Sequence, residues 1–164
     1  MNLKENLQQE MKDALKSGNS SKRTLMGMIL TAIKNREFEK RSKLSKTEKD
    51  VAKLEEQSKL NDEEIIEVVS SEIKKRKDSI EQYQKGGRPE LAEQEKKEAE
   101  MLMAYMPEQM SEEDVRDEVK KAITETGAKD VKEMGKVIGA VIAKVKGKAD
   151  GQMVSRLVKE ELSK

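Results

Sequence analysis

The sequence predicts an all-α protein, and three observations support this fold class. Alanine, glutamate, lysine, leucine and methionine, all strong helix formers, are abundant, and the chain has only two prolines. Charged residues make up 41% of the chain and aromatic residues only 2%, which favours a thin, layered helical protein over one with a thick core. The apolar residues recur three and four positions apart, which is the spacing of one helix face.

The first two predicted helices form a hairpin. An apolar stripe from Leu3 to Leu15 predicts the first helix, and Gly18 stands where a C-terminal cap is expected. Asn19 and the serines after it are suitable N-caps for a second helix, whose stripe runs from Leu25 to Ile33. The next stretch, Glu37 to Leu60, is rich in charge and poor in apolar residues. We expect it to be either a projecting helical extension or a mobile loop.

Two longer helices follow in the predicted N-terminal domain. Asn61 with Glu64 has the pattern of a capping box, and the helix that it starts should end at Gly86 and Gly87. Pro89 suits the first turn of the next helix, because proline lacks only an N–H that the first turn leaves unpaired. Pro107 should stop that helix.

A second group of caps predicts a separate C-terminal domain. Ser111 with Asp114 opens a helix that Gly127 should close. Two short helices are expected after it, at about 131–146 and 151–163, the last with Asp150 as its N-cap. The predicted organisation is therefore an N-terminal helical bundle at 1–110 and a small three-helix domain at 111–164.

The composition excludes several classes of chemistry. The chain has no cysteine and no histidine, so disulfides, thiolate catalysis and the commonest general base and metal ligand are absent. No nucleophile with a base beside it is visible, and we predict no catalytic residue, no metal site and no cofactor. No apolar run approaches the ~18 residues that span a bilayer. We therefore expect a soluble cytoplasmic protein that does not contact membranes.

The strongest candidate site lies in Met134–Val158, which holds four of the nine glycines. Between Lys136 and Lys148 the only ionisable side chains are four lysines. We name them the lysine patch: Lys136, Lys144, Lys146 and Lys148. Lysines near a helix end suit RNA phosphates, which they contact as point charges. The alternative is a solvated helix face with no ligand.

Two further features have alternative interpretations. Gly135 and Gly139 place small residues on one helix face, where RNA or merely the neighbouring helix approaches closely. The basic run Lys74–Lys77 winds around its helix, so it indicates a solvated surface more than a second phosphate contact.

Several segments resemble a known family. The run GKVIGAVIAKVKGKADG at 135–151, followed by VSRLV at 154–158, resembles the C-terminal tail of GatB, the tRNA-binding subunit of glutamine-dependent tRNA amidotransferase. Together with EIKKRKDS at 72–79, GRPEL at 87–91 and YMPEQMS at 105–111, it is still more similar to the YqeY family of free-standing small proteins. The stretch Glu37 to Leu60 departs from the family pattern, because it is longer and more charged than the usual connection.

The resemblance implies a tRNA-binding or amidotransferase-associated module. The family is linked to carbon–nitrogen ligase activity with glutamine as the amide donor, but the catalytic part of the amidotransferase has no counterpart in this chain. The expected partner is therefore tRNA, bound through its backbone, without catalysis by the chain alone. A helical protein–protein adaptor, docking through Met101–Met110 or through Glu37–Leu60, is the alternative. Neither the tRNA-binding interpretation nor the adaptor alternative predicts an oligomeric state.

Overall fold

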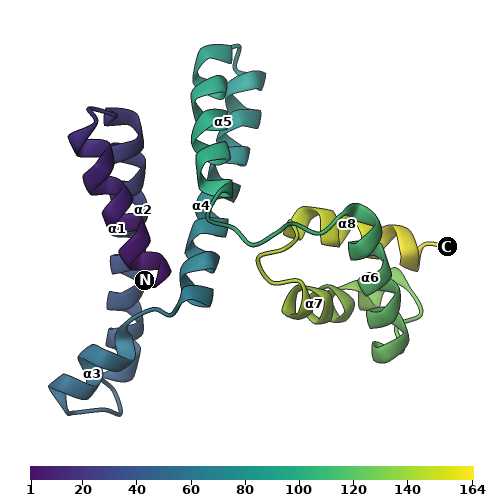
Figure 1. The fold of residues 1–164 in the computed structure, drawn as a ribbon. Coiled ribbons are helices and arrows are strands. Elements are labelled where there is room, and N and C mark those ends of the chain that lie inside the picture. Colours follow the sequence, from purple (N-terminus) through teal and green to yellow (C-terminus); the bar gives the residue numbers. More distant parts are fainter. The chain divides into compact units, whose positions relative to one another are not determined.

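The computed structural model describes residues 1–164, and every regular element in it is a helix (Figure 1). The predicted all-α class is confirmed. The chain divides into two compact units, Met1–Tyr105 and Met106–Lys164. None of the helices is both long and apolar enough to cross a membrane.

Two helical hairpins and one short helix form the N-terminal unit. Helices α1 (Leu3–Lys16) and α2 (Ser20–Leu44) make the first hairpin, and α4 (Asp62–Lys85) and α5 (Pro89–Met103) make the second. Helix α3 (Val51–Ser58) packs against α2. The core is built from the predicted apolar stripes. Its fully buried side chains include Leu7, Leu25, Met26, Ile29, Ile33, Ile65, Val69 and Leu102.

The predicted helix starts of this unit are confirmed. The Asn61 side chain accepts a hydrogen bond from the Glu64 N–H, and the Glu64 carboxylate accepts one from the Asn61 N–H, each at 2.9 Å. Pro89 is the first residue of α5. Gly18 and Gly87, in the bends of the two hairpins, have φ angles of +71° and +69°, a conformation that favours glycine.

Two helix ends differ from the sequence expectation. Helix α2 continues through the charged stretch to Leu44, because Glu37 binds Lys4 at 2.7 Å and Lys40 binds Glu64 at 2.8 Å. Of the two alternatives for Glu37 to Leu60, the structure therefore shows the helical one. Helix α5 ends at Met103, before Pro107. The proline already disfavours helical geometry at Met106, and the Tyr105 hydroxyl donates a 2.6 Å hydrogen bond to Glu10 of α1.

Three α-helices and a short 3₁₀ turn form the C-terminal unit. They are α6 (Glu112–Thr126), the turn Val131–Glu133, α7 (Met134–Lys144) and α8 (Gly151–Leu162). Every pair among the three α-helices is in contact around a core of small aliphatic residues. The buried members are Val115, Val119, Ala122, Ala128, Val137, Val141, Val145, Val154, Leu157 and Val158.

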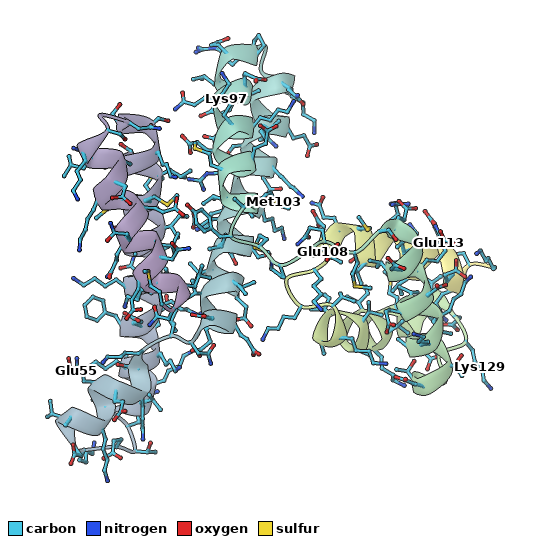
Figure 2. The ribbon with its side chains drawn as sticks, viewed as in Figure 1. Glu55, Lys97, Met103, Glu108, Glu113 and Lys129 are labelled. Carbon is cyan, nitrogen blue, oxygen red and sulfur yellow. The ribbon has the colours of Figure 1, made fainter.

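The caps of this unit follow the sequence prediction. Ser111 accepts a hydrogen bond from the Asp114 N–H, Gly127 ends α6 with a φ angle of +69°, and Asp150 caps α8. Glu113 stands in the first turn of α6 and Lys129 beyond its last turn (Figure 2). The predicted helix at 131–146 is shorter, because its first three residues form the 3₁₀ turn and its α-helical part ends at Lys144.

Candidate nucleic-acid interface

The loop that follows α7 presents two of the four residues of the lysine patch. Lys144 is the last residue of the helix, and Lys146 and Lys148 lie in the loop, all three exposed. Gly147 between them has a φ angle of +73°, which a side chain would strain. Lys136 is exposed in the first turn of the same helix. The structure thus places all four predicted lysines on the surface of α7 and its loop.

Three hydrogen bonds hold the backbone of this loop. The Gln109 side-chain amide donates to the Gly147 carbonyl at 2.8 Å, and the Met110 N–H donates to the Lys148 carbonyl at 2.8 Å. A third, from the Lys148 N–H to the Val145 carbonyl, closes the turn at 2.8 Å. The lysine side chains therefore project from a fixed backbone, so binding a ligand costs little loop entropy.

The acids paired with Lys144 and Lys136 come from outside the segment Met134–Val158. Lys144 Nζ lies 2.8 Å from a Glu125 oxygen on α6, and Lys136 lies 3.7 Å from Glu133, whereas Lys148 makes no ion pair. Sequence analysis missed Glu125 because only the packing of α6 on α7 brings it there. These exposed ion pairs are screened by water and salt, so a phosphate can replace the carboxylate at little cost.

The two glycines of α7 face open space. A Cβ atom built at Gly135 or Gly139 meets nothing within 4 Å, and both residues are exposed. Packing against a neighbouring helix, one of the two explanations offered by the sequence, is therefore wrong, because α7 packs through Val137 and Val141 instead. With Ala143 also exposed, this face of α7 lacks bulky side chains where a ligand would approach the backbone.

The basic run on α4 is not one surface. Lys74, Lys75 and Lys77 are exposed, but the Arg76 side chain is only 5% exposed. Its guanidinium contacts Glu72 and Glu98, each at 3.1 Å, and so links α4 to α5. For Arg76, both the solvated-surface and the phosphate interpretations are wrong. In the sequence, the position of Arg76 on the apolar stripe between Ile73 and Ile80 was the signal that could have predicted its burial.

Burial and hydrogen bonding compete at Glu72. Desolvation alone raises the pKa of this carboxyl, but hydrogen bonds from Lys75 and Arg76 outweigh it, so the pKa lies below its usual value. Glu95 lacks such hydrogen bonds, and its pKa is raised by burial and by the charge of Glu98, with Arg76 opposing. The cluster is therefore a structural ion-pair network beside one carboxyl, Glu95, whose ionised form is disfavoured.

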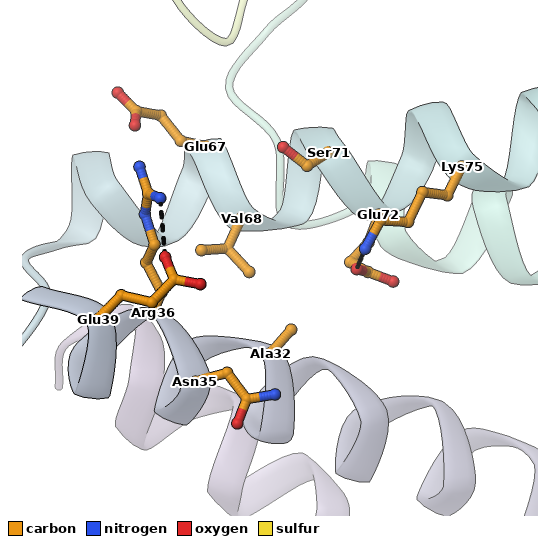
Figure 3. Close-up of a pocket in the computed structure, with 9 residues that line it drawn as sticks. All are labelled: Ala32, Asn35, Arg36, Glu39, Glu67, Val68, Ser71, Glu72 and Lys75. Atoms are coloured by element: carbon orange, nitrogen blue, oxygen red, sulfur yellow. Dashed lines mark hydrogen bonds and ion pairs between the residues drawn. The ribbon is translucent and has the colours of Figure 1, made fainter.

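A groove of about 390 Å³ runs between α2 and α4 (Figure 3). Its charges are paired with one another: Arg36 with Glu39 at 3.2 Å and Lys75 with Glu72 at 2.6 Å. A second hollow of about 590 Å³ shares Ala32, Asn35, Glu72 and Lys75 with it and extends along α2 toward Thr24. Glu39, Glu67 and Glu72 also line the groove and would repel a phosphate, whereas the sequence has no acid between Lys136 and Lys148. No group of three or more acidic side chains is arranged to hold a metal ion.

Comparison with known proteins gives one result for the chain. The model of a family described as "Yqey-like protein" matches residues 46–162, from the turn after α2 to the end of α8. A search of curated proteins finds no match. The matched part covers well over half of the chain and includes the whole lysine patch, and the protein therefore belongs to the YqeY family.

Proposed function

We propose that this protein is a tRNA-binding or amidotransferase-associated module, and that the lysine patch holds the RNA backbone. The observation that carries the proposal is the loop after α7. Lysines stand at every second position from Lys144 to Lys148, on a backbone held by Gln109 and Met110. A phosphate backbone is the ligand that suits closely spaced cations without base-reading side chains beside them.

The two glycines support close approach of the same ligand. Interior helix glycine costs about 1 kcal/mol relative to alanine, and Gly139, inside α7, does not recover that cost through packing. Gly135, in the first turn, also packs against nothing. An open, flat helix face beside the lysines lets a sugar–phosphate backbone lie against α7. The resemblance of this stretch to the GatB tail supports tRNA as the RNA class.

In this proposal, the protein by itself catalyses no amide transfer. A chain with neither histidine nor cysteine lacks the usual base and nucleophile for amide transfer. Purified protein supplied with Glu-tRNA, glutamine and ATP should yield no Gln-tRNA. Turnover by homogeneous protein would overturn this part of the proposal.

The patch is tested by charge reversal. Lys144→Glu, Lys146→Glu and Lys148→Glu together should weaken tRNA binding and lower the slope of log affinity against log salt by about one unit for each phosphate that is no longer neutralised. Fluorescence anisotropy at several salt concentrations measures both quantities. Circular dichroism should show unchanged helicity, because the three side chains are exposed.

The matched control reverses the same charge elsewhere. Lys74, Lys96 and Lys97 are exposed and make no ion pair, so the triple change to glutamate there should have the smaller effect. Equal weakening by the two triple variants would show that net charge, not the patch, drives binding. Unchanged affinity of the patch variant would favour the alternative, a protein–protein adaptor, for which the exposed apolar Val51 on α3 is a candidate contact.

A further inference from the structure

An exposed aromatic residue stands among cations on α2. Phe38, the single phenylalanine of the chain, is 55% exposed. Lys34, one turn before it, places its Nζ 5.7 Å from the ring centroid, and Arg41 follows at i+3. These three residues share one stripe of the helix, and we call them the Phe38 surface. The family model begins at residue 46, so the Phe38 surface lies outside the matched part.

The acids of this region are occupied by other groups. Glu37 binds Lys4 of α1 at 2.7 Å, and Glu39 binds Arg36 at 3.2 Å. The Glu48 carboxylate accepts hydrogen bonds from the N–H groups of Lys49 and Asp50. No ion pair forms at Lys34, Arg41, Lys43 or Lys46. Seven basic residues therefore stand between 34 and 49 against three glutamates whose charges are engaged.

We propose that the Phe38 surface binds an unpaired nucleobase of RNA, with Phe38 stacking on the base and Lys34 and Arg41 contacting the flanking phosphates. An aromatic ring beside cations is the arrangement by which proteins hold single-stranded nucleic acid, since every base has a face to stack and every linkage a charge to neutralise. Lys34 and Arg41 lie about 10 Å apart along the helix axis, on either side of the ring.

Charge favours RNA over a protein partner here. A protein docking on Phe38 would bury it in an apolar contact and would need acids for Lys34 and Arg41, whereas RNA supplies both the flat apolar face and the negative charge. The inference extends the proposed function from the RNA backbone at α7 to an unpaired base at α2. It rests on the proposed function only in that both ligands are RNA.

A tryptophan reporter tests the stacking directly. The chain contains no tryptophan, so Phe38→Trp introduces a single indole, and Met28→Trp does the same at another exposed site on α2, in the second hollow. A 12-nucleotide oligouridylate should quench the indole at position 38 saturably, because stacking on a base quenches its fluorescence. The indole at position 28 should respond much less.

Affinity variants give an independent measurement. Phe38→Ala should weaken binding of the oligouridylate about tenfold, and should leave the salt slope unchanged because the phosphates keep the same cations. Leu15→Ala, at a 59% exposed site of α1, is the matched control and should have no effect. Replacing Lys34 and Arg41 by alanine should lower the salt slope instead.

The outcomes separate this inference from the proposed function. If RNA binds by anisotropy but the indole at position 38 stays unquenched, the Phe38 surface is not a base site and the inference fails while the proposal for the lysine patch stands. If the indole is quenched while the lysine-patch variant binds normally, the inference stands and the α7 site fails. If Phe38→Ala disrupts binding of a protein but not of RNA, the surface is a protein interface and the inference is overturned.

Discussion

The two units of this protein place their charged residues differently. In the N-terminal unit Arg76 is buried between α4 and α5, with Glu72 and Glu98 as its partners. In the C-terminal unit the buried core is aliphatic, and its ion-paired cations all stay at least 25% exposed, although the Glu161 side chain is only 7% exposed. There Arg116 binds Glu160 and Glu161 but keeps 25% of its side chain exposed.

The difference shows that losing an ion-pair partner costs more stability at a buried cation than at an exposed one. A buried cation depends on its carboxylates, because nothing else replaces the water that it has given up. A surface cation returns to water when its partner is removed, and the net cost is small. The same principle makes the lysine patch available to a ligand and Arg76 unavailable.

The largest expected effect comes from Arg76→Ala. Removing the guanidinium leaves Glu72 and Glu98 partly buried without their shared partner, and we expect the free energy of unfolding to fall by about 3–5 kcal/mol. Arg116→Ala removes three ion pairs from the other unit, to Glu112, Glu160 and Glu161, and should still cost much less because the Arg116 side chain is 25% exposed. Chemical denaturation followed by circular dichroism measures both. Equal destabilisation would contradict the comparison.

The second prediction concerns the aliphatic core. Leu157 is fully buried on α8, so Leu157→Ala should cost about 2–5 kcal/mol by leaving a cavity. Ile142→Ala, at a 42% exposed position of α7, is the control and should cost far less.

This variant also tests the two-domain prediction. If residues 1–110 and 111–164 are separate domains, thermal unfolding shows two transitions, of which Leu157→Ala lowers one and Arg76→Ala the other. A single transition lowered by both variants would contradict independent domains.

Local signals predicted the framework of the fold. The capping residues Asn61, Ser111 and Asp150 marked helix starts correctly, because a cap acts within its own turn. The sequence left open whether α2 extends into the charged stretch, because charge in a sequence does not show whether a partner lies on another helix. Lys4 and Glu64 are those partners for Glu37 and Lys40.

The exposure of the lysine patch was predicted from the sequence, but its electrostatic surroundings were not. The four lysines were found from the sequence because they are close together in the chain, and the structure finds them exposed. The pairing of Lys144 with Glu125 and the open space over Gly139 depend on how α6 and α7 pack, so no local pattern contains them. The burial of Arg76 had a local signal, its position between Ile73 and Ile80, whereas its partner Glu98 on α5 had none.

The third prediction concerns Gly139→Ala, which should raise stability but weaken tRNA binding. Because a Cβ atom there meets nothing within 4 Å, Gly139→Ala should stabilise the C-terminal unit by about 0.5–1 kcal/mol. If RNA approaches this face closely, the same change should weaken tRNA binding. Ala143→Gly, on the same exposed face, should destabilise the unit without weakening binding. A Gly139→Ala variant that is more stable and binds tRNA normally would remove the glycine face from the proposed interface.

The smallest expected effect, and the sharpest probe of the buried cluster, is the pH dependence of two glutamates. Burial and the charge of Glu98 raise the pKa of Glu95, so its ionised form destabilises the folded state at neutral pH. Glu95→Gln should therefore raise stability at about pH 7, and the gain should disappear as the pH falls below the raised folded-state pKa and then the unfolded value of about 4.3.

Glu72 should behave in the opposite way. Burial tends to raise its pKa, but hydrogen bonds from Lys75 and Arg76 lower it below the unfolded value, so its stabilising effect is present at neutral pH and is lost in acid. Glu72→Gln should thus destabilise the N-terminal unit at about pH 7 and should have little effect near pH 3. Urea denaturation at several pH values measures both differences. If both variants changed stability at neutral pH in the same direction, Arg76 would not distinguish between its neighbouring carboxylates. That result would contradict the hydrogen-bonded cluster described for α4 and α5.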